Sequence, residues 1–220
     1  MVQSLISTDR LRRFPVTPDV QSPMYNHKHA MSADPPPLPP IAQILDAAVF
    51  AAQRHAAQRR KGMAQEPYIN HLLEVAGLLA HGPDPVDVNL VTAGLLHDVI
   101  EDTPTTIEEV TQRFGEDVAA LVLEVTDDKS LPKQVRKDLQ VSTAPRKSAR
   151  AQKLKAADKI SNLRTLIVSP PMDWSPERRA EYASWARRVI DGCGTLDGYL
   201  KEEFDRTHAA CANLAGAARA

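Results

Sequence analysis

Apolar residues recur every three or four positions along most of the chain beyond residue 40, which is the spacing of a helix with one buried face. Helices are predicted from about Ile41 to Gln58, Pro67 to Gly82, Val86 to Asp98, Thr106 to Phe114, Val118 to Val125, Ala149 to Leu166 and Pro176 to Ile190, with a glycine-interrupted helix beyond. No stretch shows the alternation of apolar and polar residues that is typical of a half-buried strand. The pattern therefore predicts an all-α fold, a helical bundle.

Local signals support some of these helix boundaries. Thr106 and Glu109 fit the capping box, in which each side chain satisfies a free backbone N–H of the first turn. Ser175 is a suitable N-cap before Pro176, which is tolerated as a first helical residue. The segment 127–148 is polar, rich in lysine and interrupted by two prolines, so it is predicted to be a loop. A loop of this length inside a compact domain is more often functional than idle.

The first 40 residues show no helical or strand periodicity and contain five prolines between positions 35 and 40. Such a composition predicts a disordered, proline-rich tail over residues 1–40. Met31 stands shortly before the first predicted helix and is a candidate for the natural start of the protein. We expect a single domain at 41–200, followed by a C-terminal helical extension at 201–220.

Four titratable residues stand together at the end of the otherwise apolar third helix: His97, Asp98, Glu101 and Asp102. Residues four apart share a helix face, so Glu101 is expected beneath His97 and Asp102 beneath Asp98. Burying such groups is costly unless a metal or an opposite charge compensates. The alternative is a helix end that becomes polar as it leaves the core.

Two further polar residues in apolar surroundings favour a metal site over that alternative. His71 follows Pro67-Tyr68-Ile69-Asn70, and Asp158 follows Ala156-Ala157 in another predicted helix. Helical bundles build metal sites in their cores from such inward-facing side chains. Imidazole and carboxylate groups suit a divalent ion, and no thiolate accompanies them.

The overall composition excludes several classes of protein. Lys and Arg total 27 against 28 Asp and Glu, a net charge of −1, so the total shows no excess of positive charge for a nucleic-acid or membrane partner. No apolar run reaches the ~18 residues of a membrane span. The two cysteines, Cys193 and Cys211, are too few to staple a domain, so a cytoplasmic location is expected.

The near-zero net charge conceals a strongly basic segment. Residues 129–164 hold eleven basic and two acidic residues, a net charge of +9 that leaves −10 for the rest of the chain. Basic residues next to a carboxylate-rich metal site would attract a small polyanion. For most of these lysines and arginines, simple solvent exposure remains the alternative.

Five blocks of sequence together resemble the HD-domain metal-dependent phosphohydrolases, and within them the small, animal-type alarmone hydrolases of the RelA/SpoT-homologue family. The blocks lie between about Ile41 and Tyr199: Gln58-Arg59-Arg60-Lys61, Pro67-Tyr68-Ile69-Asn70-His71, Leu95 to Thr103, Glu124 to Lys129, and Ala157-Asp158-Lys159 through Asn162-Leu163. The resemblance implies the HD-domain bundle, with the metal site in its core.

The resemblance also implies roles for individual residues. It implies that one divalent ion, usually Mn²⁺ in this family, is bound by His71, His97, Asp98 and Asp158. Glu101 and Asp102 match the acidic pair that positions and deprotonates the attacking water. The nucleotide would contact Arg60, Lys61, Tyr68 and Asn162, and weaker candidates for phosphate contact are Lys133, Lys155 and Lys159. For Tyr68, packing is an equal alternative.

Some nearby residues do not match these roles. His55 does not occupy the position of the family's first ligand, which corresponds to His71, so we expect it to be structural or close to the substrate. For Arg59 we expect a solvated helix end. The family often has His-Pro where this chain has His71-Leu72, and the loop 62–66 also differs, which leaves nucleotide preference open.

The leading hypothesis is Mn²⁺-dependent hydrolysis of the 3′-pyrophosphate of (p)ppGpp, giving GDP or GTP and pyrophosphate. The motifs by themselves indicate only metal-assisted hydrolysis of a phosphate ester. One alternative is an HD phosphohydrolase for another nucleotide, such as a 2′-phosphorylated dinucleotide or a nucleoside monophosphate. Another is a non-catalytic alarmone-binding protein. The hydrolase blocks occupy the folded part, so we expect no synthetase domain, and the sequence favours no oligomeric state.

Overall fold

The computed structural model describes residues 39–82, 85–194, 196 and 198–217, and this part of the chain is helical. The helices are α1 Pro40–Arg54, α2 Ile69–Ala80, α3 Val88–Leu96, α4 Val99–Asp102, α5 Ile107–Phe114, α6 Glu116–Val125, α7 Lys133–Thr143, the 3₁₀ helix η1 Ala144–Arg146, α8 Ala149–Val168, α9 Pro176–Asp191 and α10 Gly198–Ala217. The described residues contain one isolated β-bridge, Arg59 with Pro67, and no strand. The expected all-α fold is confirmed.

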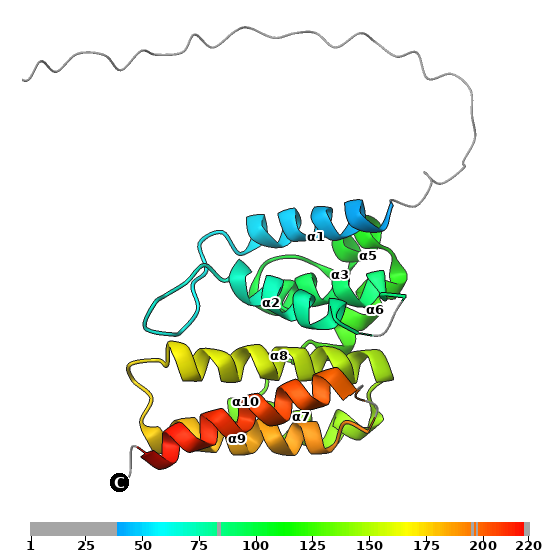
Figure 1. Ribbon diagram of the computed structural model, residues 1–220. Helices are drawn as coiled ribbons and strands as arrows, with labels where there is room; N and C mark the ends of the chain where they lie inside the picture. The colour runs from blue at the N-terminus through cyan, green and yellow to red at the C-terminus, as the bar shows by residue number, and fades with distance from the viewer. Residues whose placement is uncertain (1–38, 83–84, 195, 197, 218–220) are drawn as a thin grey trace, which may run out of the picture. The chain divides into compact units, whose positions relative to one another are not determined.

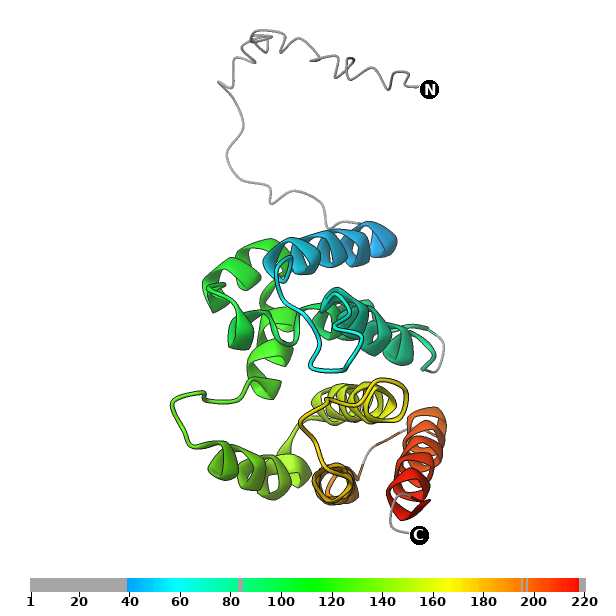
Figure 2. The same cartoon turned by 90° about the vertical axis from the view of Figure 1, so that its left-hand side faces the viewer.

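Helix α8 lies at the centre of the bundle. It packs against α2, α3, α6, α9 and α10. Figure 1 shows α1, α2, α3, α5 and α6 on one side of α8, and α7, α9 and α10 on the other. In Figure 2, the chain passes between the two groups of helices at one edge, from the end of α6 to the start of α7.

The sequence of α8 explains its central position. Ala151, Ala156 and Ala157 are fully buried, and their small side chains allow neighbouring helices to approach closely. Leu154, Ile160 and other buried residues face different neighbours, so α8 has no single solvent-facing side. Several polar side chains of this helix are therefore buried, among them Lys155, Lys159 and Ser161.

Helices α2 and α3 are held close together by a glycine. A Cβ added at Gly94 would lie 2.8 Å from Leu79 Cδ1 and 3.3 Å from the backbone Cα of Ala76. These distances are shorter than normal carbon contacts, so a side chain at this position would push the helices apart. Gly94 thereby fixes how close the ends of α2 and α3 come.

The first helix ends earlier than predicted. It stops at Arg54 rather than near Gln58. The following residues form a loop that is closed by hydrogen bonds between its own backbone atoms. The backbone N–H of Arg60 donates to Glu66 O at 2.9 Å, and that of Tyr68 donates to Gln58 O at 3.1 Å. No glycine or proline marks this end in the sequence, so the helix predicted from the periodicity was too long.

The expectation of a loop over 127–148 was wrong, because this segment contains α7 and η1. Helix α7 has no buried residue, and its sequence is mostly polar. Tertiary contacts hold it instead: Trp185 Nε1 on α9 donates to Lys137 O at 3.0 Å, and Lys137 Nζ lies 4.8 Å from the centre of the Trp185 ring.

Other boundaries follow the predicted signals. Thr106 Oγ1 accepts from the backbone of Glu109 at 3.3 Å, and Ser175 Oγ accepts from that of Arg178 at 3.3 Å. Gly115, with φ of 87°, separates α5 from α6.

Residues 1–38, which include nearly all of the expected tail, lie outside the described residues. The expected division at residue 200 stays a prediction, and α10 continues across that position. No helix in the described ranges combines the length and the apolar character needed to cross a membrane.

Candidate functional site

Four residues from separate helices and helix ends converge at one point in the bundle. His71 is on α2, His97 directly follows α3, Asp98 directly precedes α4, and Asp158 is on α8. Ligand-type atoms of His71, His97 and Asp158 all lie within 4.8 Å of one another. Asp98 Oδ2 is 3.1 Å from His97 Nε2 and 3.6 Å from His71 Nε2. The structure thus brings together all four residues that were expected to bind a metal.

The donor atoms of this cluster fit a divalent cation. His97 Nδ1 donates to the backbone O of Gly94 at 2.9 Å, so its Nε2 can present a lone pair to the cluster. That buried Nε2 makes no hydrogen bond within the described residues. His71 has the same arrangement, with Nδ1 2.8 Å from Ser161 Oγ and Nε2 toward Asp98. Metal-binding histidines use this division of roles between their two ring nitrogens.

The electrostatics of the cluster also favour a cation. Burial opposes the charged form of His97, but the Asp98 and Asp158 carboxylates raise the pKa of its imidazole to about 9. Carboxylates this close together draw positive charge to the point between the two imidazoles, as a proton or as a divalent ion.

Tyr68 lies directly against the cluster. Its hydroxyl donates to Asp98 Oδ2 at 2.6 Å, and its ring stacks on His55 with 5.1 Å between ring centres. Burial and the Asp98 carboxylate both raise the pKa of Tyr68, so it remains a neutral donor. The side chain therefore packs inside the bundle and also holds a carboxylate of the cluster.

Both oxygens of Asp158 are also hydrogen-bonded by neighbours on α8. Asn162 Nδ2 donates to Oδ1 at 2.6 Å, and Lys159 Nζ donates to Oδ2 at 2.7 Å. The Lys159 ammonium lies 4.7 Å from the centre of the Trp185 ring, and the residue as a whole is 3 % exposed. The Lys159 ammonium is thus already engaged by Asp158. Its contact with phosphate stays a prediction.

Glu101 and Asp102 lie beside the cluster on the short helix α4. Glu101 Oε2 accepts from the backbone N–H of Asp127 at 3.2 Å, and burial together with the Asp98 charge raises the pKa of Glu101. Lys129 Nζ donates to Asp102 and lies 3.8 Å from Glu101 Oε1. The acidic pair is thus close to the four-residue cluster and is faced by a cation.

The basic segment reaches this centre through only some of its residues. Arg136 Nη1, from α7, lies 3.8 Å from Glu101 Oε1. Lys155 Nζ donates to Val125 O at 2.7 Å, and its burial lowers the pKa of the ammonium. Lys133, in contrast, is exposed in the first turn of α7. Its contact with phosphate stays a prediction.

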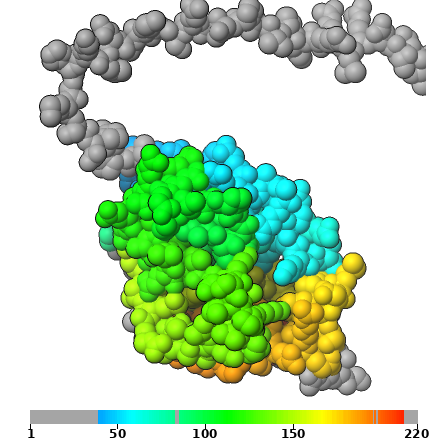
Figure 3. All heavy atoms as spheres, turned by 180° about the vertical axis from the view of Figure 1, so that it is seen from behind, coloured from blue at the N-terminus to red at the C-terminus, as the bar shows by residue number. Residues whose placement is uncertain are grey.

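Two pockets adjoin these residues. One, of about 150 Å³, is lined by Tyr68, His97, Asp98, Glu101, Gln140, Lys155, Asp158 and Asn162. Figure 3 shows the surface hollowed between the green segment that carries α7 and the cyan loop that follows α1. The other pocket, of about 260 Å³, is lined by Arg60, Gly62, Glu74, Arg164, Thr165 and Ser169.

Arg60 connects the two pockets. Its Nη2 donates to Asn162 Oδ1 at 3.3 Å, beside the carboxylates, and to Thr165 Oγ1 in the larger pocket. Lys61, the next residue, is exposed. Arg59 is also exposed and donates to backbone O atoms of its own turn, in agreement with the expectation of a solvated residue.

Sequence reasoning missed the contribution of several residues. Gln58 Nε2 donates to Asp102 Oδ2 at 2.8 Å, and His55 Nδ1 donates to Gln58 Oε1 at 2.6 Å. Gln140, on α7, donates from Nε2 to Asp127 Oδ2 at 2.6 Å. Gln58 stands in one of the blocks that carry the resemblance, which is the only signal that could have found it.

The chain is similar to known proteins over nearly all of this helical part. The HD domain family matches residues 47–189. The guanosine-3′,5′-bis(diphosphate) 3′-pyrophosphohydrolase MESH1 of Homo sapiens is 48% identical over 161 residues, which cover 73% of this chain and 90% of that protein. The MESH1 of Drosophila melanogaster is 43% identical over 166 residues, with 76% and 93% covered.

A solved structure shares the fold. It is described as a metazoan orthologue of SpoT that hydrolyses ppGpp and has a role in starvation responses. It is 41% identical to this chain and superposes with a TM-score of 0.73, covering 80% of this chain and 97% of the other.

Proposed function

Because this chain belongs to the HD domain family, and within it to the guanosine-3′,5′-bis(diphosphate) 3′-pyrophosphohydrolases, we propose that it hydrolyses the 3′-pyrophosphate of ppGpp and pppGpp. The products are GDP or GTP and pyrophosphate. The observation that carries this proposal is the convergence of two imidazoles and two carboxylates, of which His97, Asp98 and Asp158 line one pocket together with Glu101. That pocket is faced by cations suited to a polyphosphate.

His71, His97, Asp98 and Asp158 would together hold one divalent ion, and Mn²⁺ is the proposed ion. Two nitrogen and two carboxylate donors suit such an ion. When bound, it polarises a phosphoryl oxygen and makes a coordinated water more acidic. The hydrogen bonds to both Asp158 oxygens and from Tyr68 to Asp98 keep the carboxylates oriented toward it.

Glu101 and Asp102 are proposed to take the proton of the attacking water. A carboxylate whose pKa is raised by burial and by a neighbouring charge is a stronger base, as is expected of Glu101. The water oxygen bonds to the phosphorus next to the ribose 3′-oxygen, and the bond from phosphorus to that oxygen breaks. The 3′-oxygen takes up the proton that the carboxylate received from the water and ends as a hydroxyl. Lys129 and Arg136 are close enough to the pair to meet the phosphate oxygens.

We propose that the nucleoside occupies the larger pocket beside Arg60. Arg60 and Asn162 touch each other between the two pockets, so they can guide a nucleotide whose phosphates enter the smaller one. Lys61 and Tyr68 are retained as nucleotide contacts. Lys133, Lys155 and Lys159 remain candidates for phosphate contact, and of these Lys155 lines the smaller pocket.

A small nucleotide is the proposed partner, rather than a nucleic acid or a membrane. The net charge of −1 supports this, because the chain as a whole has no excess of positive charge. Cys193 and Cys211 are both free, which supports the proposed cytoplasmic location.

A product assay tests the function directly. The full chain with Mn²⁺ is given ppGpp, pppGpp, a dinucleotide bearing a 2′-phosphate, and a deoxynucleoside monophosphate. We expect GDP or GTP and pyrophosphate from the first two, and no product after the metal is chelated. Turnover of another nucleotide without release of pyrophosphate from ppGpp would replace this proposal with the other HD phosphohydrolase activity. Binding of ppGpp without turnover would favour the non-catalytic alternative.

A further inference from the structure

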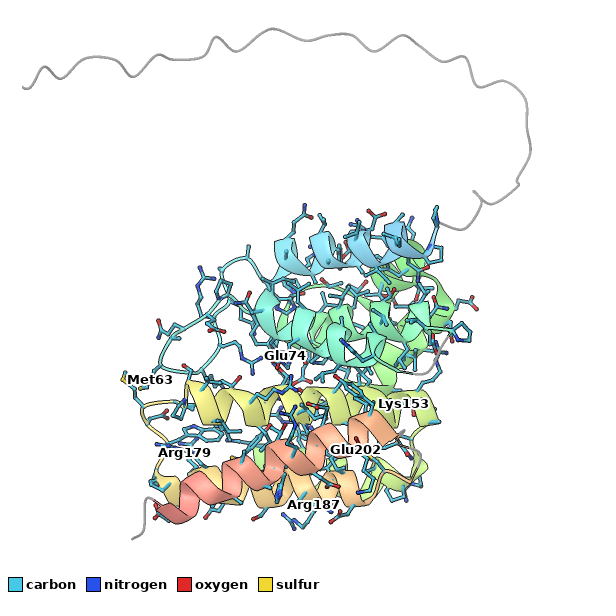
Figure 4. All side chains as sticks on the ribbon, viewed as in Figure 1. Met63, Glu74, Lys153, Arg179, Arg187 and Glu202 are labelled. Carbon is cyan, nitrogen blue, oxygen red and sulfur yellow. The ribbon has the colours of Figure 1, made fainter. Side chains whose placement is uncertain are left out.

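His71 is connected to a carboxylate near the protein surface by two consecutive hydrogen bonds. Its Nδ1 lies 2.8 Å from Ser161 Oγ, and Ser161 Oγ lies 2.6 Å from Glu74 Oε2. The three residues come from two helices, with His71 and Glu74 on α2 and Ser161 on α8. Figure 4 labels Glu74, which lies between these two helices.

The donor and acceptor chemistry gives this chain of hydrogen bonds one direction. An ionised carboxylate only accepts hydrogen bonds, so the Ser161 hydroxyl donates its single hydrogen to Glu74. Ser161 Oγ then has only lone pairs to offer His71, and Nδ1 of His71 must carry the hydrogen. In a neutral imidazole this leaves a lone pair on Nε2, the nitrogen that faces Asp98 and Asp158.

Without Glu74 this direction would be lost. The Ser161 hydroxyl could rotate and donate to His71 Nδ1 instead, and the ring would then carry its hydrogen on Nε2. A protonated Nε2 cannot bind a metal ion. Both groups lie inside the bundle, because His71 is 2 % exposed and Ser161 is fully buried.

Glu74 is itself held in place by an ion pair. Arg164 Nη1 donates to Glu74 Oε1 at 2.9 Å, and Arg164 Nη2 donates to Glu203 Oε2 on α10 at 2.5 Å. The Glu74 side chain is 32% exposed, so this pair fixes a carboxylate that would otherwise be free to move. Glu203 shares Arg164 with Glu74, but the Ser161 hydroxyl donates to Glu74, which makes Glu203 a matched control.

We propose that Glu74 is a positioning residue for the metal centre: through Ser161, it holds His71 in the tautomer that can bind the ion. This inference rests on the proposed metal binding by His71. Partners of metal ligands that act in this way typically change metal affinity by about 10- to 100-fold.

The first test compares Glu74→Gln with Glu203→Gln in the full chain by Mn²⁺ titration calorimetry. In Glu74→Gln, Arg164 holds the amide oxygen, so the NH₂ group faces Ser161 and the hydroxyl loses its acceptor. We expect this variant to weaken Mn²⁺ binding about 10- to 100-fold, and Glu203→Gln to change it less than about twofold. Ser161→Ala should weaken binding to a similar degree. The double variant Glu74→Gln/Ser161→Ala should lose no more than the stronger single variant, because both changes break the same connection. Equal affinities for Glu74→Gln and Glu203→Gln would overturn the proposal.

A second test reads the tautomer itself. Nitrogen NMR of the metal-free protein should find the His71 hydrogen on Nδ1 in the unchanged chain and in Glu203→Gln, and on Nε2 in Glu74→Gln. Thermal unfolding of each variant checks that it is folded. A His71 hydrogen that stays on Nδ1 in Glu74→Gln contradicts the proposal. This measurement needs neither metal nor substrate, so it separates failure of the positioning role from failure of the proposed activity.

Discussion

The side-chain amide of Gln58 donates a hydrogen bond of 2.8 Å to Asp102 Oδ2 across 44 positions of the sequence. Gln58 is oriented in turn by His55, whose Nδ1 donates to Gln58 Oε1 at 2.6 Å. With its oxygen engaged by His55, the amide must turn its NH₂ group toward Asp102. His55 also stacks on Tyr68, so one buried histidine supports two neighbours of the metal centre. These contacts fit a structural role for His55, which is one of the two roles expected of it.

Replacing Gln58 by Leu should lower kcat for ppGpp by about 10-fold or more, with the affinity for Mn²⁺ unchanged. The substitution removes a hydrogen bond to a charged group, which is worth about 1.5–3 kcal/mol. It leaves the four metal-binding side chains untouched. Steady-state kinetics and Mn²⁺ titration measure the two effects separately.

Gln53→Leu is the matched control for this change, because Gln53 is exposed in the last turn of α1. It should keep full activity. If Gln58→Leu behaved in the same way, orientation of Asp102 by Gln58 would not contribute to catalysis.

Glu101→Gln should retain Mn²⁺ binding and lose turnover by about 100-fold or more, the usual contribution of a general base. Glutamine keeps the shape of the side chain but cannot accept the proton of the attacking water. Asp98→Ala, in contrast, should abolish both metal binding and activity. The water-activating role would be refuted if Glu101→Gln and Asp102→Asn each kept the full rate on the best substrate.

Arg136→Gln should lower kcat/KM for ppGpp by about 10-fold, mainly through a higher KM. Arg136 lies 3.8 Å from Glu101 and is the part of α7 that reaches the acidic pair. Loss of a charge-assisted contact to phosphate has about this magnitude. Arg146→Gln removes an exposed charge from the same basic segment and serves as the control. Equal effects of the two substitutions would show that only the total charge of the segment matters.

The four residues of the buried cluster could be singled out from sequence because each is a polar side chain in an apolar helical setting. His71 and Asp158 illustrate this, since both belong to helices whose neighbouring residues are buried. The all-α fold follows from the same periodicity. The local spacing of apolar residues indicates which positions of a helix are buried, and this spacing can be read directly from the sequence.

The residues that sequence reasoning missed are defined by distant partners. Gln58 depends on Asp102, and Ser161 depends on Glu74, 87 positions away. Helix α7 was missed for a related reason: contacts with α9 hold it, and its own sequence is mostly polar. Nothing in a single local pattern reports such contacts.

Replacing Gly94 by Val should destabilise the protein by about 1–3 kcal/mol and weaken Mn²⁺ binding, because overpacking shifts the helices that carry the ligands. A Cβ at this position would lie 3.3 Å from the backbone of Ala76, which cannot move away alone. The shift would separate His71 on α2 from His97 at the end of α3. Denaturant unfolding and Mn²⁺ titration measure the two consequences.

Gly77→Ala provides the opposite expectation on the same helix pair. A Cβ at Gly77 meets nothing within 4 Å, and alanine is favoured over glycine inside a helix by about 1 kcal/mol. This variant should therefore be more stable and should bind Mn²⁺ as the unchanged protein does. If Gly94→Val left Mn²⁺ affinity as unaffected as Gly77→Ala, the close approach of α2 and α3 would not determine the geometry of the metal centre.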